Sequence, residues 1–201
     1  MSQEFHVDYP TLIDGIDQLI EQYNASAIAI DGMSGAGKAE LAAVLSRRYG
    51  APVIHMSDFV LPYGERSEGW ETTPAGEIDF VRFREEIVDP WMQKKPLVYS
   101  ICDPESGEIV ERRALPDARL YIIEGTYCLH PFIPDFYDMR IYMATTPEKR
   151  LAKAGLTPQR AALEDTYFVL YMTEILSDVA LDDNFRIPAL TEEPTTPVEE
   201  E

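Results

Sequence analysis

The sequence has few cysteines, few basic residues and no long apolar run, and each shortage excludes a class of protein. Among its 201 residues the cysteines are Cys102 and Cys128, with no CxxC pair and no histidine pair at zinc-ligand spacing. No segment approaches the roughly 20 apolar residues that a membrane-spanning helix needs. The first residues also lack the basic and then apolar layout of a signal peptide. We therefore expect a cytoplasmic protein with two free thiols, because a disulfide would need an oxidising compartment.

Basic side chains are outnumbered by acidic ones. The chain has 17 Lys and Arg residues against 36 Asp and Glu residues, which gives a formal net charge of −19 at pH 7. Such a surface repels phosphate backbones, so we expect no nucleic-acid partner. The excess charge can equally serve as a solubilising surface. Basic residues that gather at one site would then be informative, because so few are available.

Apolar segments alternate between strand-like and helix-like spacing along most of the chain. The strand-like segments are 27–31, 53–56, 120–124, 139–144 and 178–181, and the helix-like segments are 9–23, 40–49, 80–91, 147–154 and 163–175. This alternation predicts one α/β domain over residues 1–189, with a parallel sheet covered by helices on both faces. We expect a loop at 60–78, a hairpin insertion at 97–113 and a disordered acidic tail at 190–201.

A glycine-rich turn follows the first strand-like segment. Residues 32–38 read Gly-Met-Ser-Gly-Ala-Gly-Lys, which is the GxxxxGK spacing of a P-loop. The glycines let backbone N–H groups converge on phosphate oxygens, the following helix adds its N-terminal donors, and Lys38 brings a charge to the β and γ phosphates. The alternative is a glycine-rich turn that merely carries a lysine. The motif predicts that a nucleoside triphosphate binds to Gly32, Ser34, Gly35, Ala36, Gly37, Lys38 and Ala39.

The residue after Lys38 departs from the P-loop pattern. A Ser or Thr at this position ligates Mg²⁺ through its hydroxyl group, whereas this chain has Ala39. Water can replace the missing ligand, but the metal is then positioned less firmly. We expect phosphate binding to survive this change more readily than fast catalysis.

Three carboxylates stand where predicted strands end, namely Asp31, Asp58 and Glu124. In an open parallel sheet, ligands bind beyond the carboxyl ends of the strands, which is the side of the P-loop. Asp58 is the candidate to orient an acceptor hydroxyl and take its proton, and Glu124 is the candidate to hold Mg²⁺ or its waters. Asp31, at the base of the loop, is expected to be structural. Each of the three could instead serve as a turn or helix-cap carboxylate.

Several segments together resemble the uridine kinase-like P-loop kinases, a group that also contains phosphoribulokinase and bacterial pantothenate kinase. The resemblance spans roughly residues 25 to 184 and rests on the order of 27–38, Asp58-Phe59, 78–83, 123–127, His130-Pro131 and Tyr137-Asp138. It implies a three-layer P-loop NTPase fold with a five-stranded parallel sheet. It also implies ATP with Mg²⁺ as phosphate donor and a nucleoside-like alcohol as acceptor. Kinases of this type often form dimers or tetramers, so a homo-oligomer is compatible with it.

The resemblance also implies an acceptor pocket. Asp58 would contact the accepting hydroxyl and Arg82 would help to line the pocket, although Arg82 could equally be a solvated helix charge. Phe59, Tyr63 and Tyr99 are candidates to stack on a base, and each could equally pack in the core or in a loop.

Such kinases carry several arginines after the fourth strand, where these neutralise charge on the transferred phosphoryl group. Here Arg150 and Arg160 are present, while Lys153 stands where a second arginine is expected, and the stretch is short. Lysine keeps the charge but not the bidentate geometry of a guanidinium group.

These features support three interpretations. The leading one is an ATP-dependent phosphotransferase acting on a nucleoside (uridine-like) or a similar small alcohol. The second is a nucleotide-binding P-loop protein with impaired or no kinase activity and a regulatory role, which Ala39 and the thinned lid motivate. The third is a P-loop hydrolase or a kinase for another metabolite.

Overall fold

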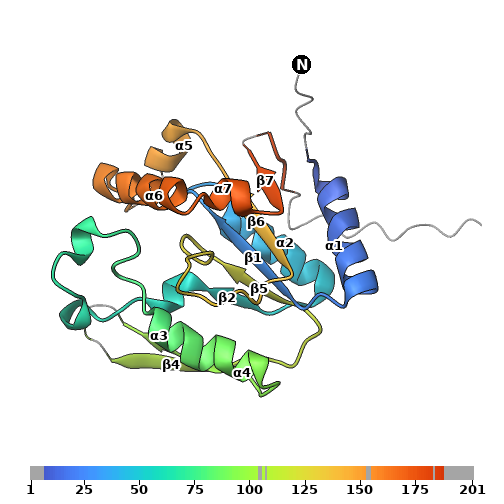
Figure 1. The fold of residues 1–201 in the computed structure, drawn as a ribbon, viewed down its shortest axis with the longest axis horizontal. Helices are drawn as coiled ribbons and strands as arrows, with labels where there is room; N and C mark the ends of the chain where they lie inside the picture. Colours follow the sequence, from blue (N-terminus) through green and yellow to red (C-terminus); the bar gives the residue numbers. More distant parts are fainter. Residues whose placement is uncertain (1–6, 104–105, 107, 153–154, 183, 188–201) are drawn as a thin grey trace, which may run out of the picture.

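The computed structural model contains a five-stranded parallel sheet between helices (Figure 1), and it describes residues 7–103, 106, 108–152, 155–182 and 184–187. The strands of this sheet are β1 (Ala27–Gly32), β2 (Val53–His55), β5 (Tyr121–Glu124), β6 (Met139–Met143) and β7 (Val179–Leu181). Their spatial order is β2-β5-β1-β6-β7, and every neighbouring pair is parallel. The predicted fold class is therefore confirmed.

Helices precede, connect and follow these strands. They are α1 (Tyr9–Tyr23), α2 (Lys38–Tyr49), α3 (Phe80–Phe83), α4 (Asp89–Met92), α5 (Pro147–Ala152), α6 (Pro158–Leu170) and α7 (Thr173–Leu176). A π-helical segment, Arg84–Val88, joins α3 to α4, so the predicted helix 80–91 is one continuous helical stretch with a widened middle. Short 3₁₀ turns occur at Met56–Phe59, Tyr63–Glu65 and Trp70–Thr72.

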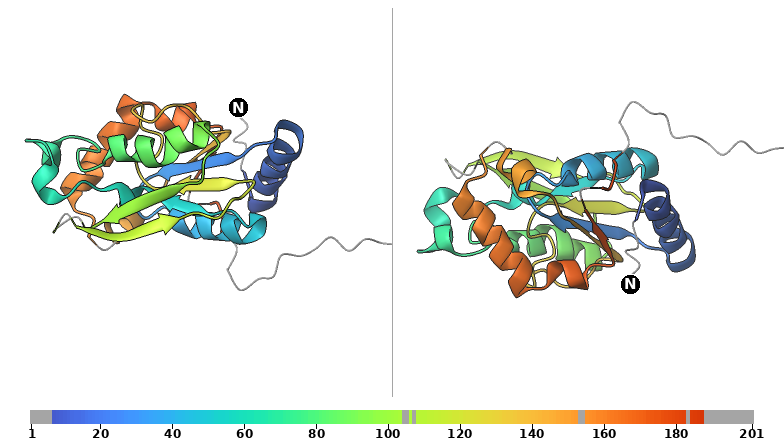
Figure 2. Two further views of the ribbon diagram at one scale, coloured as in Figure 1. Left: turned by 90° about the horizontal axis from the view of Figure 1, so that it is seen from below. Right: turned by 90° about the horizontal axis from the view of Figure 1, so that it is seen from above.

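The two faces of the sheet have different cores, because alternate residues of a strand point to opposite sides. Ile28 and Ile30 of β1 pack in a cluster with residues of α1 and α2. Ala27 and Ala29 face the other side, where small side chains leave room for a cluster of aromatic residues from α3, α6 and the hairpin. In Figure 2, α2 lies on one side of the sheet, and α3, α4 and α6 lie on the other.

The helix predicted at 163–175 has different bounds in the structure. Helix α6 already begins at Pro158, where Thr157 caps it by accepting a hydrogen bond from the backbone N–H of Arg160. It ends before Met172, which adopts a left-handed backbone conformation (φ 50°) and separates α6 from α7. Capping residues and a single left-handed residue therefore override the apolar periodicity.

The predicted hairpin is confirmed as an antiparallel pair, β3 (Val98–Cys102) and β4 (Ile109–Ala114). An isolated bridge between Val60 and Ile78 closes the base of the loop predicted at 60–78. Cys102 and Cys128 are both free thiols, as expected. None of the helices in the described part of the chain has the length and hydropathy that a membrane-spanning helix requires. The predicted tail at 190–201 and Lys153 lie outside the described residues.

Candidate functional site

The glycine-rich turn forms a tight loop between β1 and α2. Gly32 has a φ of 138°, and a Cβ atom there would lie 2.1 Å from the backbone oxygen of Met143 on β6. Gly35 has a φ of 84°, and its Cβ would lie 3.0 Å from the backbone oxygen of Lys149. The N-terminus of α2 follows directly at Gly37 and has no side-chain cap. Its first N–H groups therefore remain directed into the loop, which is the geometry of a phosphate cradle.

Lys38 braces this loop from within. Its Nζ atom donates hydrogen bonds to the backbone oxygens of Gly32 (2.8 Å) and Met33 (2.9 Å). Burial lowers the pKa of its ammonium group, while the carboxylates of Asp31 and Glu164 oppose that shift. The ammonium group of Lys38 therefore lies inside the loop, where backbone oxygens and carboxylates surround it.

Asp31 is fully buried at the base of the loop. It accepts hydrogen bonds from the backbone N–H groups of Gly32 (2.6 Å), Tyr127 (3.1 Å) and Leu129 (3.0 Å), and from the hydroxyl group of Tyr167 (2.7 Å). Burial raises the pKa of Asp31, and the hydrogen bonds from Tyr167, Leu129 and Gly32 counteract the rise. Asp31 therefore ties the end of β1 to the segment after β5 and to α6, as its expected structural role requires.

A cleft of about 520 Å³ opens beside the loop. It brings together seven of the residues predicted from the sequence, namely Ser34, Gly35, Gly37, Lys38, Ala39, Glu124 and Arg160. Among the described residues, its charged lining consists of the carboxylates Glu40, Glu77, Glu124 and Glu164 and the cations Lys38, Lys149 and Arg160. The cleft is therefore slightly acidic even though it contains the phosphate cradle.

Glu124 is paired with a histidine that the sequence reasoning missed. The Nδ1 atom of His55 lies 2.5 Å from Oε1 of Glu124, and the two residues are partners in the parallel register of β2 and β5. The hydrogen bond to Glu124 raises the pKa of His55, although burial acts in the opposite direction. His55 could have been found within the predicted strand 53–56, three positions before Asp58.

Asp58 lies in the 3₁₀ turn after β2 and takes part in a three-residue network. Its Oδ2 atom accepts hydrogen bonds from the hydroxyl of Tyr99 (2.8 Å) and from the guanidinium group of Arg113 (3.2 Å). Arg113 also donates to the Tyr99 hydroxyl oxygen (3.0 Å). Arg113 was not predicted, but Tyr99 and Arg113 are register partners in the hairpin. Symmetric pairing about the turn would have placed Tyr99 opposite Arg112, because the register shift between Ile101 and Cys102 is not visible in the sequence.

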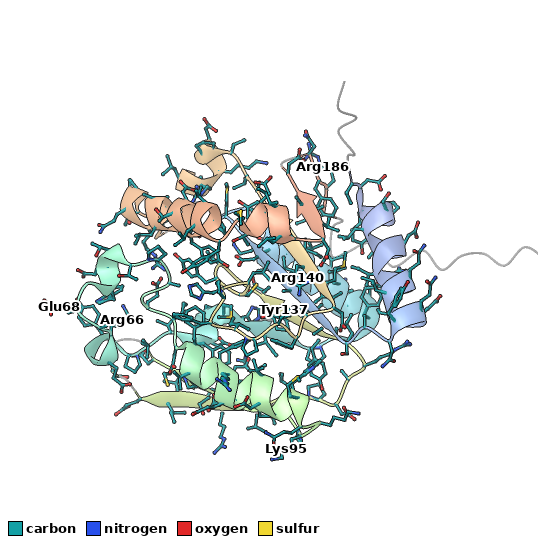
Figure 3. The ribbon with its side chains drawn as sticks, in the orientation of Figure 1. Arg66, Glu68, Lys95, Tyr137, Arg140 and Arg186 are labelled. Atoms are coloured by element: carbon teal, nitrogen blue, oxygen red, sulfur yellow. The ribbon has the colours of Figure 1, made fainter. Side chains whose placement is uncertain are left out.

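The aromatic residues proposed to stack on a base pack against other side chains of the protein. Phe59 is completely buried and its ring stacks on Tyr99 (centroids 5.2 Å apart), which is buried too. This packing corrects the expectation that either ring is available to a ligand. Tyr63 is exposed, but it packs edge-on against Trp70 away from the cleft, with the guanidinium of Arg66 over both rings. Figure 3 shows Arg66 on this outlying loop.

Arg82 is neither a pocket residue nor a solvated charge. Its guanidinium group donates to the backbone oxygens of Asp58 (3.1 Å) and Ser100, and it lies over the ring of Phe59. It also forms an ion pair with Asp79 (3.2 Å), the residue that caps α3. This corrects both readings: Arg82 fastens α3 to the hairpin and to the turn that carries Asp58.

The expected lid cations are paired with carboxylates. Arg150 is buried and donates to Glu164 (2.9 Å) and to Asp165 (2.6 Å), both on α6. Arg160 lines the cleft and forms an ion pair with Glu77 (2.7 Å). Glu164 was not predicted, because a glutamate inside a helix carries no sequence signal of its own.

The loop geometry fits a nucleotide polyphosphate, since close backbone approach and uncapped helix N–H groups are both present. The site offers few ligands to Mg²⁺. Ala39 has no hydroxyl, and the described residues contain no group of three or more His, Cys, Asp or Glu side chains that could hold a metal. Mg²⁺ commonly binds one or two carboxylates together with water and substrate phosphates. Glu124 is the carboxylate that would supply the protein's share.

Solved structures share this architecture. A possible uridine kinase from Bacillus stearothermophilus matches with a TM-score of 0.63 and 21% identity, over 85% of this chain and 99% of that one. A candidate fructose transport system kinase from Silicibacter sp. TM1040 matches with a TM-score of 0.54 and 20% identity, over 84% and 96%. No family model and no curated protein matches the sequence. At this identity the likeness shows a shared α/β fold alone and does not establish an activity.

Proposed function

We propose that the protein is an ATP-dependent phosphotransferase that acts on a nucleoside or a similar small alcohol. The observation that supports this proposal is a carboxylate, Asp58, held next to a cleft that contains the glycine-rich loop. The phosphate cradle of residues 32–38 forms one side. Asp58 does not itself line the cleft, but its neighbours Ser57 and Val60 do, and its carboxylate is held by Tyr99 and Arg113. A uridine-like acceptor is supported by the possible uridine kinase among the similar structures.

Phosphoryl transfer then follows from the roles that these side chains can perform. The loop N–H groups and Lys38 hold the phosphates of ATP. The oxygen of the acceptor hydroxyl attacks the γ phosphorus in line with the departing ADP, and Asp58 accepts the proton of that hydroxyl. Tyr99 and Arg113 keep the Asp58 carboxylate oriented through their hydrogen bonds. Mg²⁺, when bound with the nucleotide and Glu124, would neutralise charge on the phosphates.

A second candidate function is nucleotide binding with impaired or no phosphoryl transfer. Two observations favour it: Ala39 offers no hydroxyl to the metal, and Arg150 is occupied by Glu164 and Asp165. In this case the P-loop would bind the nucleotide and signal its presence without catalysing phosphoryl transfer.

Phosphate transfer from labelled ATP and Mg²⁺ to a panel of nucleosides and other small alcohols tests the proposal. The native protein should transfer phosphate, and Lys38→Ala should lose about 10²- to 10³-fold in kcat, because the charge beside the β and γ phosphates is gone. Ala39→Ser should raise turnover about tenfold by restoring a metal ligand. Circular dichroism would check that both variants stay folded.

The same assay separates the alternatives. Binding of ATP by the native protein without transfer, together with transfer by Ala39→Ser, would favour the second function. Splitting of ATP with no acceptor present would indicate a hydrolase. Transfer that persists in Lys38→Ala would overturn the proposed site.

A further inference from the structure

A carboxylate from α6 occupies donors of the phosphate cradle. Glu164 is buried, with 4% of its surface exposed. Its Oε2 atom accepts a hydrogen bond from the backbone N–H of Ser34 (3.1 Å), and its Oε1 atom accepts one from the Ser34 hydroxyl (2.5 Å). An anion with two oxygens thus sits where the loop presents donors for a phosphate group.

Glu164 lies near the part of the loop that would hold the terminal phosphate of a nucleotide. Ser34 lies in the first half of the loop, on the side away from the N-terminus of α2. Glu164 is also close enough to Lys38 to oppose the lowering of the Lys38 pKa by burial. Because the lysine of a P-loop serves the β and γ phosphates, Glu164 stands at the terminal-phosphate end of the cradle.

Arg150 is held by the same carboxylate and is incompletely satisfied there. Its Nη2 atom donates to Glu164 Oε2 (2.9 Å) and to the backbone oxygen of Ala161 (3.0 Å). Its Nε atom is buried and has no hydrogen-bond partner. A buried donor without an acceptor is costly, so this arrangement leaves Arg150 with a donor that a phosphate oxygen could satisfy.

We propose that Glu164 is a built-in competitor for the terminal phosphate, which makes the cradle discriminate against a nucleoside triphosphate relative to the diphosphate. A diphosphate binds beside Glu164, whereas a triphosphate must displace it because two anions cannot share the Ser34 donors. Displacement releases Arg150 toward the incoming phosphate. The inference rests on the proposed nucleotide site, and it assigns to α6 the choice between the two ligands.

Affinities for ADP and for a non-hydrolysable ATP analogue, measured by calorimetry with Mg²⁺ and without acceptor, test this inference. Glu164→Gln should tighten binding of the triphosphate by about 10- to 100-fold and binding of ADP by less than about threefold. Asp165→Asn is the matched control: it removes the same charge beside the same Arg150, but Asp165 is exposed and bonds Arg150 through Nη1 rather than Nη2. It should leave the ratio of the two affinities unchanged.

Hydrogen exchange of the native protein provides a second measurement that does not depend on any variant. Amide exchange in residues 158–170 should rise with the triphosphate analogue and stay unchanged with ADP, since only the triphosphate detaches Glu164 from the loop. Equal protection by both ligands, or an equal change of both affinities in Glu164→Gln, would overturn this inference alone. Binding of neither nucleotide by the native protein and Glu164→Gln would overturn the proposed function as well.

Discussion

The two sides of the cleft are built in different ways. The phosphate side is one unbroken segment, residues 32–38, whose shape comes from backbone geometry at glycines. The proposed acceptor side lies next to the cleft and consists of Asp58, Tyr99 and Arg113, which come from a turn and from two strands of a hairpin. A site made of backbone tolerates few changes of residue but is local in sequence. A site made of side chains depends on the packing of distant segments.

Asp58→Asn should break the acceptor side and leave the phosphate side intact. We expect kcat to fall by about 10²- to 10⁴-fold, because the group that accepts the hydroxyl proton is lost. The dissociation constant for the nucleotide should change by less than about twofold, since no loop contact is removed. Steady-state kinetics with calorimetry would separate the two quantities.

Tyr99→Phe is the matched control for this variant, because it keeps the buried ring and removes one hydrogen bond to Asp58. Its kcat should fall by about tenfold or less. Full activity of Asp58→Asn would mean that the acceptor side lies elsewhere.

Gly32→Ala should break the phosphate side through the fold itself. The added Cβ would lie 2.1 Å from the backbone oxygen of Met143, and the residue would keep a φ of 138°. The free energy of unfolding should drop by about 3 to 5 kcal/mol, measured by urea denaturation. Gly15→Ala is the control, since nothing lies within 4 Å of its Cβ in α1. It should stabilise the protein by about 0.5 to 1 kcal/mol, and equal effects of the two changes would contradict the strain at Gly32.

The contributions of His130 and His55 to the stability of the protein change with pH in opposite directions. His130 stacks on Phe80 of α3 and on Tyr167 of α6, and burial lowers its pKa to about 4. The unfolded chain takes up this proton near pH 6.5, so the stability from neutral His130 is present above that pH and is lost as pH falls towards 4. His55 has a raised pKa because of its hydrogen bond to Glu124. Its contribution is present below pH 6.5 and is lost as pH rises through the folded-state value.

Urea denaturation from pH 4.5 to 8 would measure both histidines. In His130→Asn the loss of stability between pH 7 and 4.5 should be smaller than in the native protein by about 2 kcal/mol. In His55→Asn that loss should be larger than in the native protein, because the stabilising proton at the Glu124 pair is absent. Identical pH profiles for the native protein and His130→Asn would show that this ring is freely protonated.

The sequence predicted the fold and the tight glycine turn at 32–38 well, for a physical reason. Strand and helix periodicity, the glycine spacing and the capping residues are local signals, and the five strands and the loop at 32–38 follow from them. The failures lie in long-range contacts. Phe59 and Tyr99 were candidates to stack on a ligand's base, but they pack against each other and against Phe83 inside the core.

The roles of charged residues were equally hard to predict. Arg150 and Arg160 occur where lid cations are expected, yet each is matched with a carboxylate whose position depends on how α6 docks. Arg82 was placed in a pocket or in solvent and instead binds backbone oxygens of two other elements. Such pairings depend on the folded geometry, so spacing along the chain does not reveal them.

The acidic lining of the cleft has a consequence for how fast a nucleotide arrives. The protein carries a formal charge of −19, and the carboxylates around the cleft outnumber its cations. If the proposed function is right, a polyphosphate approaches against a repulsive long-range potential and is attracted only within the last few ångströms of the loop. Added salt shortens the reach of that repulsion, from about 30 Å at 0.01 M to about 8 Å at 0.15 M ionic strength. Association should speed up as ionic strength rises, the reverse of the trend for a phosphate site on a basic surface.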